Sequence, residues 1–457
     1  MEYGVISLIV PLLTIILAIV TKDVVVSLLG GIFVGDLIIH NYNFFNAFIA
    51  LFDGIISLFG EGWIAKSVIF ILLIGAIIKI LRDSGAIDDF VAWITQKFYR
   101  VDSPKGAMLL AYILGVVIFI ESSITSLIAE TVARPLCDKN GVSREKLAYI
   151  CDSTSAPICS LIPLNAWGAL LLGLIVSAID SGLIEGSGVE LLISSIPYNF
   201  YAIFTLIIVL FVIFRDFDIG AMRDAKAIPY IPKETTKESN PNPYMMILPL
   251  VVMVLLVPIG LYLSGGGDIF KGSGSTAVYY SVIVTLIFLY IYYIPKSIIS
   301  HKSYFNSLYK GIGEMIPLAT IIILALLIGS VIKELDTAGY LANLLNGNIS
   351  PIFIPLIIFL VSAITAFSTG TSWGTFSIMM PIALSLGATM DLNLSLVIAS
   401  VISGGIFGDH ASPISDTTII SSLASGCDHI EHVRTQLPYA LLAGVLASVG
   451  FLVGGVV

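Results

Sequence analysis

The 457-residue chain contains few charged residues: Asp, Glu, Lys and Arg make up 12% of it, against about 25% in soluble globular proteins. This scarcity excludes a soluble enzyme. The net charge of −9 arises from 31 acidic and 22 basic residues without a basic block, which excludes nucleic acid as a partner. The sequence also lacks HExxH, GxSxG and glycine-rich nucleotide-binding motifs, so we expect a protein that is not an enzyme.

Cysteine is equally scarce. The four cysteines contain no CxxC pair, and no histidine stands at metal-ligand spacing from them. The sequence therefore predicts no zinc site, no disulfide framework and no resident cofactor. A basic segment before the first apolar run is missing too, so we interpret residues 4–20 as a membrane span and not as a signal peptide.

The chain is rich in hydrophobic residues, which form long apolar runs. Hydrophobic residues make up 57% of it, and its mean hydropathy is +1.00. At about 20 residues per span, the chain accommodates about ten transmembrane helices. Because the apolar runs are continuous and not alternating, helices are favoured over a barrel. We predict an all-α polytopic membrane protein, with unbroken spans at 4–20, 23–39, 64–82, 192–214, 244–263, 276–294, 317–335 and 436–456.

Four further apolar segments carry polar interruptions. Residues 106–135 and 351–388 contain ESSITS and STGTSWG in their middles, which predicts two re-entrant hairpins. Residues 145–180 and 394–424 contain prolines, which break helices, so we predict one broken helix in each. For the first of these we expect Pro157 and Pro163 to interrupt the helix.

The sequence indicates an internal duplication. One hydrophilic segment, 215–243, separates two apolar halves, and 74–87 aligns without gaps on 328–341 with six identities. In the same order, 121–135 lies opposite 367–381 and 153–160 opposite 408–415. Five spans in each half is an odd number, which predicts inverted-topology repeats. We expect a first repeat at 1–214, a cytoplasmic linker at 215–243 and a second repeat at 244–457.

The distribution of positive charge predicts the orientation. Most of the 22 Lys and Arg residues fall in loops on the same side as the linker, and such loops face the cytoplasm. We therefore expect a multi-pass protein of the cell membrane with both termini outside. The amphipathic stretches 43–60 and 299–314 are predicted to lie along the membrane surfaces.

The sequence GDHASPISDTTIISS, residues 408–422, carries two acids in an apolar neighbourhood. An acid at mid-membrane costs about 2.5–3.5 kcal/mol even on lenient scales, so function is the default interpretation. Its hydroxyl and carboxylate oxygens suit Na⁺ better than a soft metal. The alternative is that both acids belong to a solvated loop. The candidate ligands here are Asp409, Ser412, Asp416 and Thr417, with both acids as candidate proton carriers.

The first half holds a similar group in AYICDSTSAPICS. Asp152 is the preferred titrating carboxylate, because proton and Na⁺ would compete for it. The alternative is that Asp152 caps the second half of a broken helix. Together with Asp152, the candidate ion ligands here are Ser153, Thr154 and Ser155.

The tips of the two hairpins offer further hydroxyls beside helix N-termini, which attract anions. Glu121 and Glu130 have no acidic counterpart in the second half, which marks one or both as possible proton or substrate groups. Glu121 is a candidate proton carrier, and pairing with Arg134 is the alternative for Glu130. His410, His429 and His432 could sense pH, although only His410 lies in a polar motif and a surface position is the commoner case for histidine. The candidate contacts at the hairpin tips are Ser122, Ser123, Thr125, Ser126, Thr369, Thr371 and Ser372.

The motifs at 143–169, 369–383 and 404–422 resemble those of NhaC-type Na⁺/H⁺ antiporters, which belong to a wider ion-transporter superfamily. The resemblance implies inverted repeats with two hairpins and two broken helices, a homodimer through scaffold helices, and elevator-like movement. By motif position it also points to the residues around Asp152, Thr369 and Asp409 as ion or substrate contacts. The first hairpin tip departs from the motif: it reads Glu-Ser-Ser, where relatives often carry an acidic pair and an Asn.

We therefore interpret the chain as a secondary active transporter that exchanges Na⁺ for H⁺. Asp152 and either Asp409 or Asp416 would bind proton and cation alternately, with Na⁺ near Asp152 and Asp416. The alternative is a Na⁺-coupled carrier or exchanger of a small organic anion or amino acid, because the family also includes organic-acid exchangers. An intramembrane enzyme and a channel are both less consistent with broken helices in two repeats.

Overall fold

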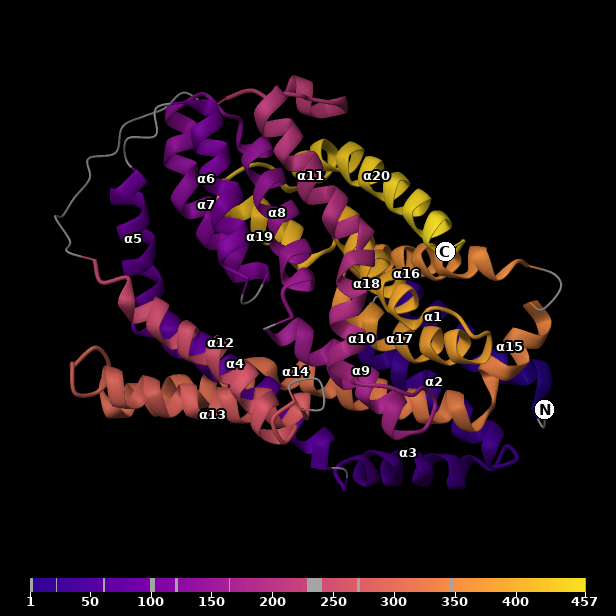
Figure 1. Cartoon of the computed structure of the whole chain (residues 1–457). Helices are drawn as coiled ribbons and strands as arrows, with labels where there is room; N and C mark the ends of the chain where they lie inside the picture. Colours follow the sequence, from indigo (N-terminus) through magenta and orange to yellow (C-terminus); the bar gives the residue numbers. More distant parts are fainter. Residues whose placement is uncertain are drawn as a thin grey trace.

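The computed structural model describes residues 3–21, 23–60, 62–98, 103–119, 122–163, 165–227, 241–268, 272–345 and 349–456, and all regular elements within these ranges are helical (Figure 1). The predicted all-α fold is confirmed. The α-helices are α1 (Ile9–Thr21), α2 (Val24–Ile39), α3 (Phe44–Leu58), α4 (Gly62–Asp83), α5 (Ala86–Phe98), α6 (Pro104–Val117), α7 (Ser122–Lys139), α8 (Arg144–Leu161), α9 (Ala166–Asp180), α10 (Gly188–Ser195), α11 (Phe200–Arg215), α12 (Tyr244–Ser264), α13 (Gly274–Tyr293), α14 (His301–Glu334), α15 (Thr337–Leu345), α16 (Ile354–Thr369), α17 (Ser372–Thr389), α18 (Leu394–Ala411), α19 (Asp416–Ser425) and α20 (His429–Gly454).

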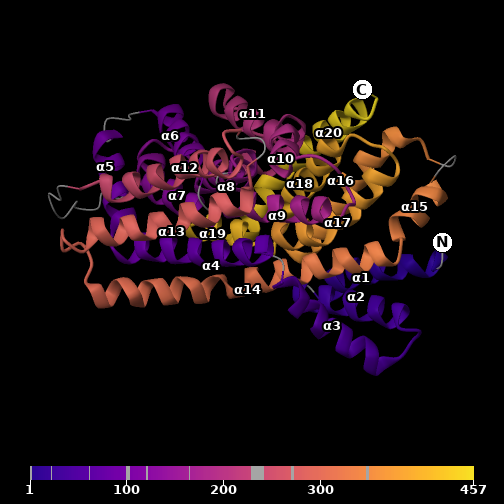
Figure 2. The ribbon, with the colours of Figure 1, turned by 60° about the horizontal axis from the view of Figure 1, so that its bottom comes forward.

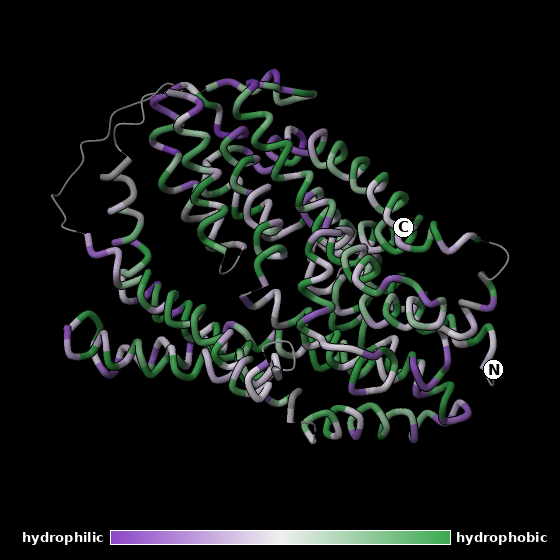
Figure 3. The backbone as a smooth tube through the Cα atoms, viewed as in Figure 1, coloured by the Kyte–Doolittle hydropathy of each residue, from purple (hydrophilic) through white to green (hydrophobic). Residues whose placement is uncertain are grey.

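Eight stretches within these ranges are long and apolar enough to cross a membrane. Two more predicted spans, α1 and α2, are apolar but shorter, with 13 and 16 residues. Figure 3 shows hydrophobic residues along most of each long helix and hydrophilic residues gathered at many of the turns. The eight stretches are Ile64–Asp83, Phe200–Asp224, Tyr244–Ser264, Gly274–Tyr293, His301–Glu334, Pro351–Thr369, Leu394–Ala411 and His429–Gly454.

The order of helices is duplicated, and five pairs of helices share one spacing. In these pairs the first residues differ by 250 in number, as Ser122 of α7 and Ser372 of α17 do. The same spacing relates α2 to α13, α6 to α16, α8 to α18 and α9 to α19. The duplication is as predicted, but the aligned segments are displaced by four or five residues, which is about one helical turn.

The predicted hairpins and broken helices are present. Helices α6 and α7 form one hairpin, and α16 and α17 form the other. The first break lies between the end of α8 at Leu161 and the start of α9 at Ala166, and the second lies at 412–415, between α18 and α19. Pro157, predicted to break the helix, lies inside α8 instead. A membrane helix tolerates an internal proline when its neighbours satisfy the freed carbonyl.

Capping side chains fix the two breaks. Asn165 accepts a hydrogen bond from the backbone N–H of Gly168 (3.0 Å) and donates to the carbonyls of Phe119, Cys159 and Ile162, each at 2.9 Å. It therefore ends α8 and begins α9. At the equivalent position, 250 residues later, Ser415 caps α19 by accepting from Thr417 N. Polar side chains at the breaks satisfy backbone groups that the helices leave unpaired.

Two groups of helices are distinguished by their packing. We call α1–α4 and α12–α14 the scaffold, and α6–α11 with α16–α20 the hairpin bundle. Figure 2 shows α4, α13 and α14 side by side along one side of the molecule, with the hairpin bundle next to them. Helices α4 and α14 come close at Gly75 and Gly311, where an added Cβ on either would lie within 2.4 Å of a carbonyl oxygen of the other.

One predicted surface helix is different in the structure. Residues 43–60 correspond to the separate helix α3, but 299–314 largely form the first turns of α14, which continues for 34 residues. The helix does not end after residue 314, since Pro317 also lies inside α14. The prediction of a separate interfacial arm at 299–314 is therefore wrong.

Candidate functional site

Asp152 lies in the middle of α8 and is fully buried. Its Oδ2 accepts a 2.7 Å hydrogen bond from Nε2 of Gln436 on α20, and Nε2 of His432, one turn earlier on α20, lies 3.4 Å from the same oxygen. Within the described residues, Asp152 Oδ1 has no hydrogen-bond partner. The alternative that Asp152 caps a helix is excluded by its place within α8, and the carboxylate keeps one oxygen available for a proton or an ion.

His410, in the last turn of α18, joins the same polar cluster. Its Nδ1 lies 2.7 Å from the hydroxyl of Tyr201 on α11, and its Nε2 lies 3.0 Å from Ser153 Oγ on α8. A neutral imidazole, with one donor and one acceptor nitrogen, satisfies both hydroxyls. Because Gln436 also donates to the backbone carbonyl of His410 at 2.7 Å, four helices meet around Asp152: α8, α11, α18 and α20.

Asp409 precedes His410 but its side chain reaches a different element, the tip of the α16–α17 hairpin. Its Oδ2 accepts hydrogen bonds from Ser372 Oγ (2.5 Å) and from the backbone N–H of Ser372 (3.2 Å). Ser372 is the first residue of α17, so the carboxylate meets the positive end of a helix dipole. Asp409 is only 4% exposed, which excludes the solvated-loop alternative for this acid.

The hairpin tip also packs against the break at 412–415. Ser412 Oγ donates a 2.7 Å hydrogen bond to the carbonyl of Phe367. Gly370 adopts φ +67°, and a Cβ on it would lie 2.6 Å from the carbonyl oxygen of Ile414. The break and the tip are therefore held together by backbone as well as side-chain contacts.

Several predicted ligands bond within their own segments. Thr154 Oγ1 donates to Ile150 O (2.9 Å) and Ser155 Oγ to Asp152 O (2.9 Å), as residues of an intact helix. Their predicted role, and the predicted Na⁺ near Asp152 and Asp416, stay predictions. Glu121 lies outside the described residues, as do the side chains of Ser123 and Asp416. At the first hairpin tip, Ser122 and Thr125 are buried at the start of α7, Thr125 donates to Ile118 O, and Ser126 contacts Ser421. At the second hairpin tip, Thr369 donates to Thr365 O and Thr371 precedes α17. At the second break, the Thr417 hydroxyl lies 3.1 Å from Ser415 Oγ.

Sequence reasoning did not place His432, Gln436 or Tyr201 beside the buried acids. The signal for the first two was present: His432, Gln436 and Tyr439 recur every three or four residues in α20 and are all buried. Polar side chains on one face of an apolar helix indicate a buried polar partner. The surface position, the commoner case for a histidine, does not apply to His432, since it is fully buried against Asp152.

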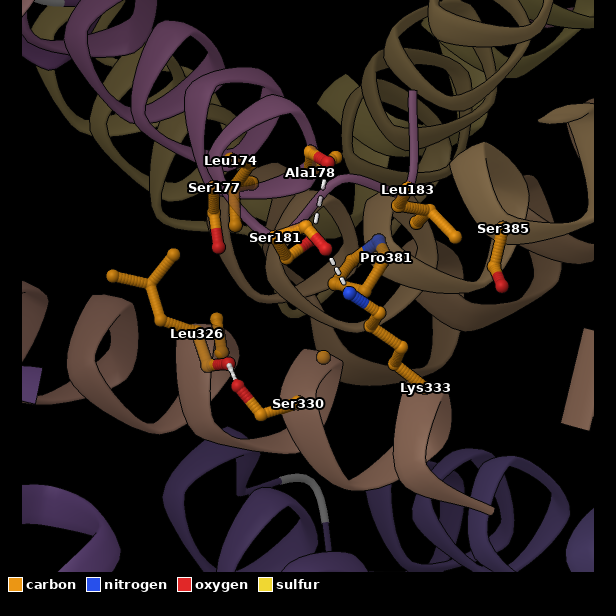
Figure 4. A pocket seen from close by; sticks show the side chains of 12 residues that line it. Leu174, Ser177, Ala178, Ser181, Leu183, Leu326, Ser330, Lys333, Pro381 and Ser385 are labelled. Atoms are coloured by element: carbon orange, nitrogen blue, oxygen red, sulfur yellow. Dashed lines mark hydrogen bonds between the residues drawn. The ribbon is translucent and has the colours of Figure 1, made fainter. Parts of the chain in front are cut away.

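A small pocket lies where scaffold helix α14 meets α9 and α17 of the hairpin bundle (Figure 4). Lys333 Nζ donates a hydrogen bond to the carbonyl of Ser181, the residue that follows α9. Gly329 and Ser330 of α14 line it together with Pro381 and Ser385 of α17. The pocket therefore marks a boundary between the scaffold and the hairpin bundle.

The chain is similar to a known protein family, to several individual proteins and to a solved structure. A sequence profile described as the Na⁺/H⁺ antiporter family matches residues 158–456. The chain is 36% identical to an uncharacterized protein of Haemophilus influenzae, over 98% of this chain and 90% of that protein. It is 30% identical to the malate-2H⁺/Na⁺-lactate antiporter of Bacillus subtilis over 34% of each protein. The crystal structure of the Alcanivorax borkumensis YdaH transporter matches with a TM-score of 0.60 and 13% identity, over 90% of this chain and 88% of that one.

Proposed function

The chain belongs to the Na⁺/H⁺ antiporter family, a family of transporters and not of enzymes, and from that premise we propose that it exchanges Na⁺ for H⁺ across the cell membrane. The contact between Asp409 and Ser372 carries this proposal. It joins a buried carboxylate at the end of a half-helix to the hydroxyl at a hairpin tip (2.5 Å), and the Gly405 carbonyl lies 3.3 Å from the same hydroxyl. Carboxylate, hydroxyl and carbonyl oxygens are the hard donors that Na⁺ prefers.

Asp152 has the properties of the proton site in this proposal. Its carboxylate accepts from Gln436 and faces His432 at 3.4 Å, and Oδ1 has no partner among the described residues. The two carboxylates are linked, because His410 follows Asp409 in the chain and shares the Gln436 amide with Asp152. Binding of Na⁺ at one carboxylate and loss of a proton from the other are then coupled by charge.

Internal pH in proteoliposomes tests the exchange. Purified protein is reconstituted, an inward Na⁺ gradient is imposed, and an entrapped dye reports pH, with and without a panel of small carboxylates and amino acids. Alkalinisation that needs Na⁺ alone supports the antiporter. A pH response that appears only after an organic solute is added contradicts it and supports the second function below.

We further propose an elevator-type movement, in which the hairpin bundle shifts against the scaffold. The boundary in Figure 4 offers a test. A Cβ on Gly329 would lie 3.3 Å from Cβ of Pro381, close to the Cβ separation of about 3.5–4.5 Å in disulfides. In a cysteine-free background, the pair Gly329→Cys and Pro381→Cys should arrest exchange when oxidised and restore it when reduced. Each single cysteine is the matched control; full exchange by the cross-linked pair would contradict the movement.

A second function, exchange of a small organic acid or amino acid, is favoured by the relative named as a malate-2H⁺/Na⁺-lactate antiporter. The backbone N–H of Ser372 at the start of α17 is a donor of the kind that binds carboxylates at helix N-termini. A thermal shift with a small carboxylate that saturates and requires Na⁺ supports this function. Absence of any shift across the panel contradicts it.

For the membrane arrangement, we propose opposed repeats at 1–214 and 244–457, a cytoplasmic linker at 215–243, and both termini outside. Lys146 on α8 pairs with Asp216 of the linker at 2.7 Å. This contact supports a position of the loop before α8 on the same side of the membrane as the linker. An epitope tag at each terminus should be accessible in intact cells. A tag in the linker should be accessible only after permeabilisation.

We also propose a homodimer, as the resemblance to NhaC-type antiporters implies. Leu255, Ile259 and Leu263 are exposed at four-residue spacing on one face of the scaffold helix α12. In a membrane, lipid or a second copy covers such a face. Photobleaching of single labelled particles in lipid nanodiscs should give two steps per particle; single steps would contradict the dimer.

A further inference from the structure

A further buried carboxylate lies on the first hairpin, apart from Asp152 and Asp409. Glu130 on α7 is 0% exposed. Its Oε1 accepts from Ser126 Oγ at 3.4 Å, and within the described residues its Oε2 has no hydrogen-bond partner. Ser126 in turn contacts the hydroxyl of Ser421 on α19. The carboxylate therefore faces the junction between the first hairpin and the second broken helix.

Arg134 acts on Glu130 through its charge, but within the described residues it forms no hydrogen bond with it. Arg134, one turn later on α7, donates instead to the carbonyl of Ala424 at 3.1 Å, where it meets the negative end of α19. The predicted alternative of a Glu130–Arg134 pair is therefore not the arrangement observed. The titratable groups that face Glu130 are Asp152 and Cys151 on α8, Arg134 on α7 and Cys427 after α19.

An ionised Glu130 in this position is poorly compensated. Burial removes the carboxylate from water, its hydrogen bond from Ser126 is long at 3.4 Å, and the negative charge of Asp152 repels it. The Ser421 hydroxyl and the Arg134 guanidinium offset these effects only in part. A buried carboxyl in such surroundings binds a proton unless a cation is close by. Ser126 and Ser421 add two hydroxyl oxygens beside it, so entry of a cation would release the proton without leaving an uncompensated charge.

We propose that Glu130 is a second proton-binding residue of the exchange cycle, in addition to Asp152. This inference rests on the proposed Na⁺/H⁺ exchange. When Na⁺ enters, the carboxyl O–H bond of Glu130 breaks, its proton leaves to the aqueous phase, and the remaining carboxylate is balanced by the cation. Because Ser421 belongs to α19 and Glu130 to the hairpin, both move with the hairpin bundle, and the proton is carried with them.

Glu130→Gln tests this, because the amide has the shape of a protonated carboxyl but cannot release a proton. The first measurement is the infrared spectrum of the purified protein in H₂O and in D₂O without Na⁺. The wild type should show a protonated-carboxyl band at neutral pH that shifts in D₂O, and the variant should lack this contribution. Glu190→Gln, at an exposed position on α10, is the matched control and should retain it.

The second measurement is the ratio of protons to Na⁺ moved, obtained from the pH gradient that stops Na⁺ flux in proteoliposomes. The ratio should fall by one proton per cycle in Glu130→Gln and remain unchanged in Glu190→Gln. Glu130→Asp keeps a carboxyl and should retain the wild-type ratio; it replaces the Gln variant if that variant does not fold. An unchanged infrared spectrum in Glu130→Gln overturns the proposal. A wild type without Na⁺-driven proton flux would defeat the exchange function separately, whatever the infrared result.

Discussion

The side-chain amide of Gln436 on α20 donates to the carboxylate of Asp152 on α8 and to the carbonyl of His410 on α18, both at 2.7 Å. One amide thus connects a helix of the first half to two helices of the second. Gln436 Oε1, in contrast, has no hydrogen-bond partner within the described residues. The amide orientation is therefore set by its two acceptors, and the Asp152 carboxylate is held where the two halves meet.

Asp152→Asn should abolish Na⁺-dependent proton movement and leave the protein folded. The Asn oxygen can still accept from Gln436, so the helix contact remains, but an amide does not bind and release a proton at physiological pH. Proton flux in proteoliposomes and the elution profile on size exclusion check the two statements. Exchange at the wild-type rate would exclude Asp152 as the proton site.

Gln436→Leu should destabilise the protein, because it removes the donor to the buried His410 carbonyl and the shorter of the two contacts to Asp152 Oδ2. Loss of a partner from a buried polar group costs about 1–3 kcal/mol. The unfolding temperature in detergent should fall accordingly. Ser448→Ala on the same helix removes only a bond to its own helix carbonyl, Gly444 O, and should have little effect; equal effects of the two variants would contradict a special role for Gln436.

Ser372→Ala should weaken Na⁺ binding, since it removes the hydroxyl 2.5 Å from Asp409. We expect the Na⁺ concentration for half-maximal exchange to rise about tenfold, equivalent to about 1.4 kcal/mol. Ser377→Ala is the control, because its hydroxyl bonds to Trp373 O within α17. If both variants keep the wild-type Na⁺ dependence, Na⁺ does not bind at the hairpin tip.

Gly370→Ala should impair both stability and transport. The residue has φ +67° and its new Cβ would lie 2.6 Å from Ile414 O. Left-handed backbone costs a non-glycine residue about 1–2 kcal/mol, and the clash adds to this by separating the hairpin tip from the break. Gly313→Ala, with open space around its Cβ position in α14, should be tolerated. Similar melting curves for the two variants would contradict the tight contact at Gly370.

The sequence predicted the hairpins, the breaks and the buried acids because each leaves a local signal. Polar residues inside apolar runs indicated Asp152 and Asp409, and both are buried. It did not predict Gln436, whose contact with Asp152 spans 284 positions. The local pattern marks a polar face on α20, but it does not specify that this face meets α8, since that depends on how α11, α18 and α20 pack together.

The sequence alignment of the two repeats is displaced by about one helical turn from the spacing of the helices in the structure. Apolar helices are rich in Ile, Leu and Gly, and a shift of one turn leaves the same face of the helix aligned, so chance identities accumulate at that shift. The capping residues are more informative. Ser143 and Asn393 cap α8 and α18, and Asn165 and Ser415 cap α9 and α19, each pair 250 apart in number.

Cys427 provides a test of sidedness. Arg144 donates to the neighbouring Gly426 carbonyl at 3.1 Å, and two residues later Lys146 pairs with Asp216 at the start of the linker. Cys427 and the linker therefore lie at the same end of α8, which we predict to face the cytoplasm. Cys427 is partly exposed, whereas Cys137, Cys151 and Cys159 are buried.

A membrane-impermeant maleimide should modify Cys427 in inside-out vesicles and not in right-side-out vesicles. Burial raises the pKa of the Cys427 thiol to about 11, and only the thiolate reacts. Modification should therefore be slow at pH 7 and about tenfold faster for each pH unit up to 9. Cys427→Ser should remove the labelling, because the other three thiols are buried. Labelling from the outside would place this end of α8, and with it the linker, on the opposite side of the membrane.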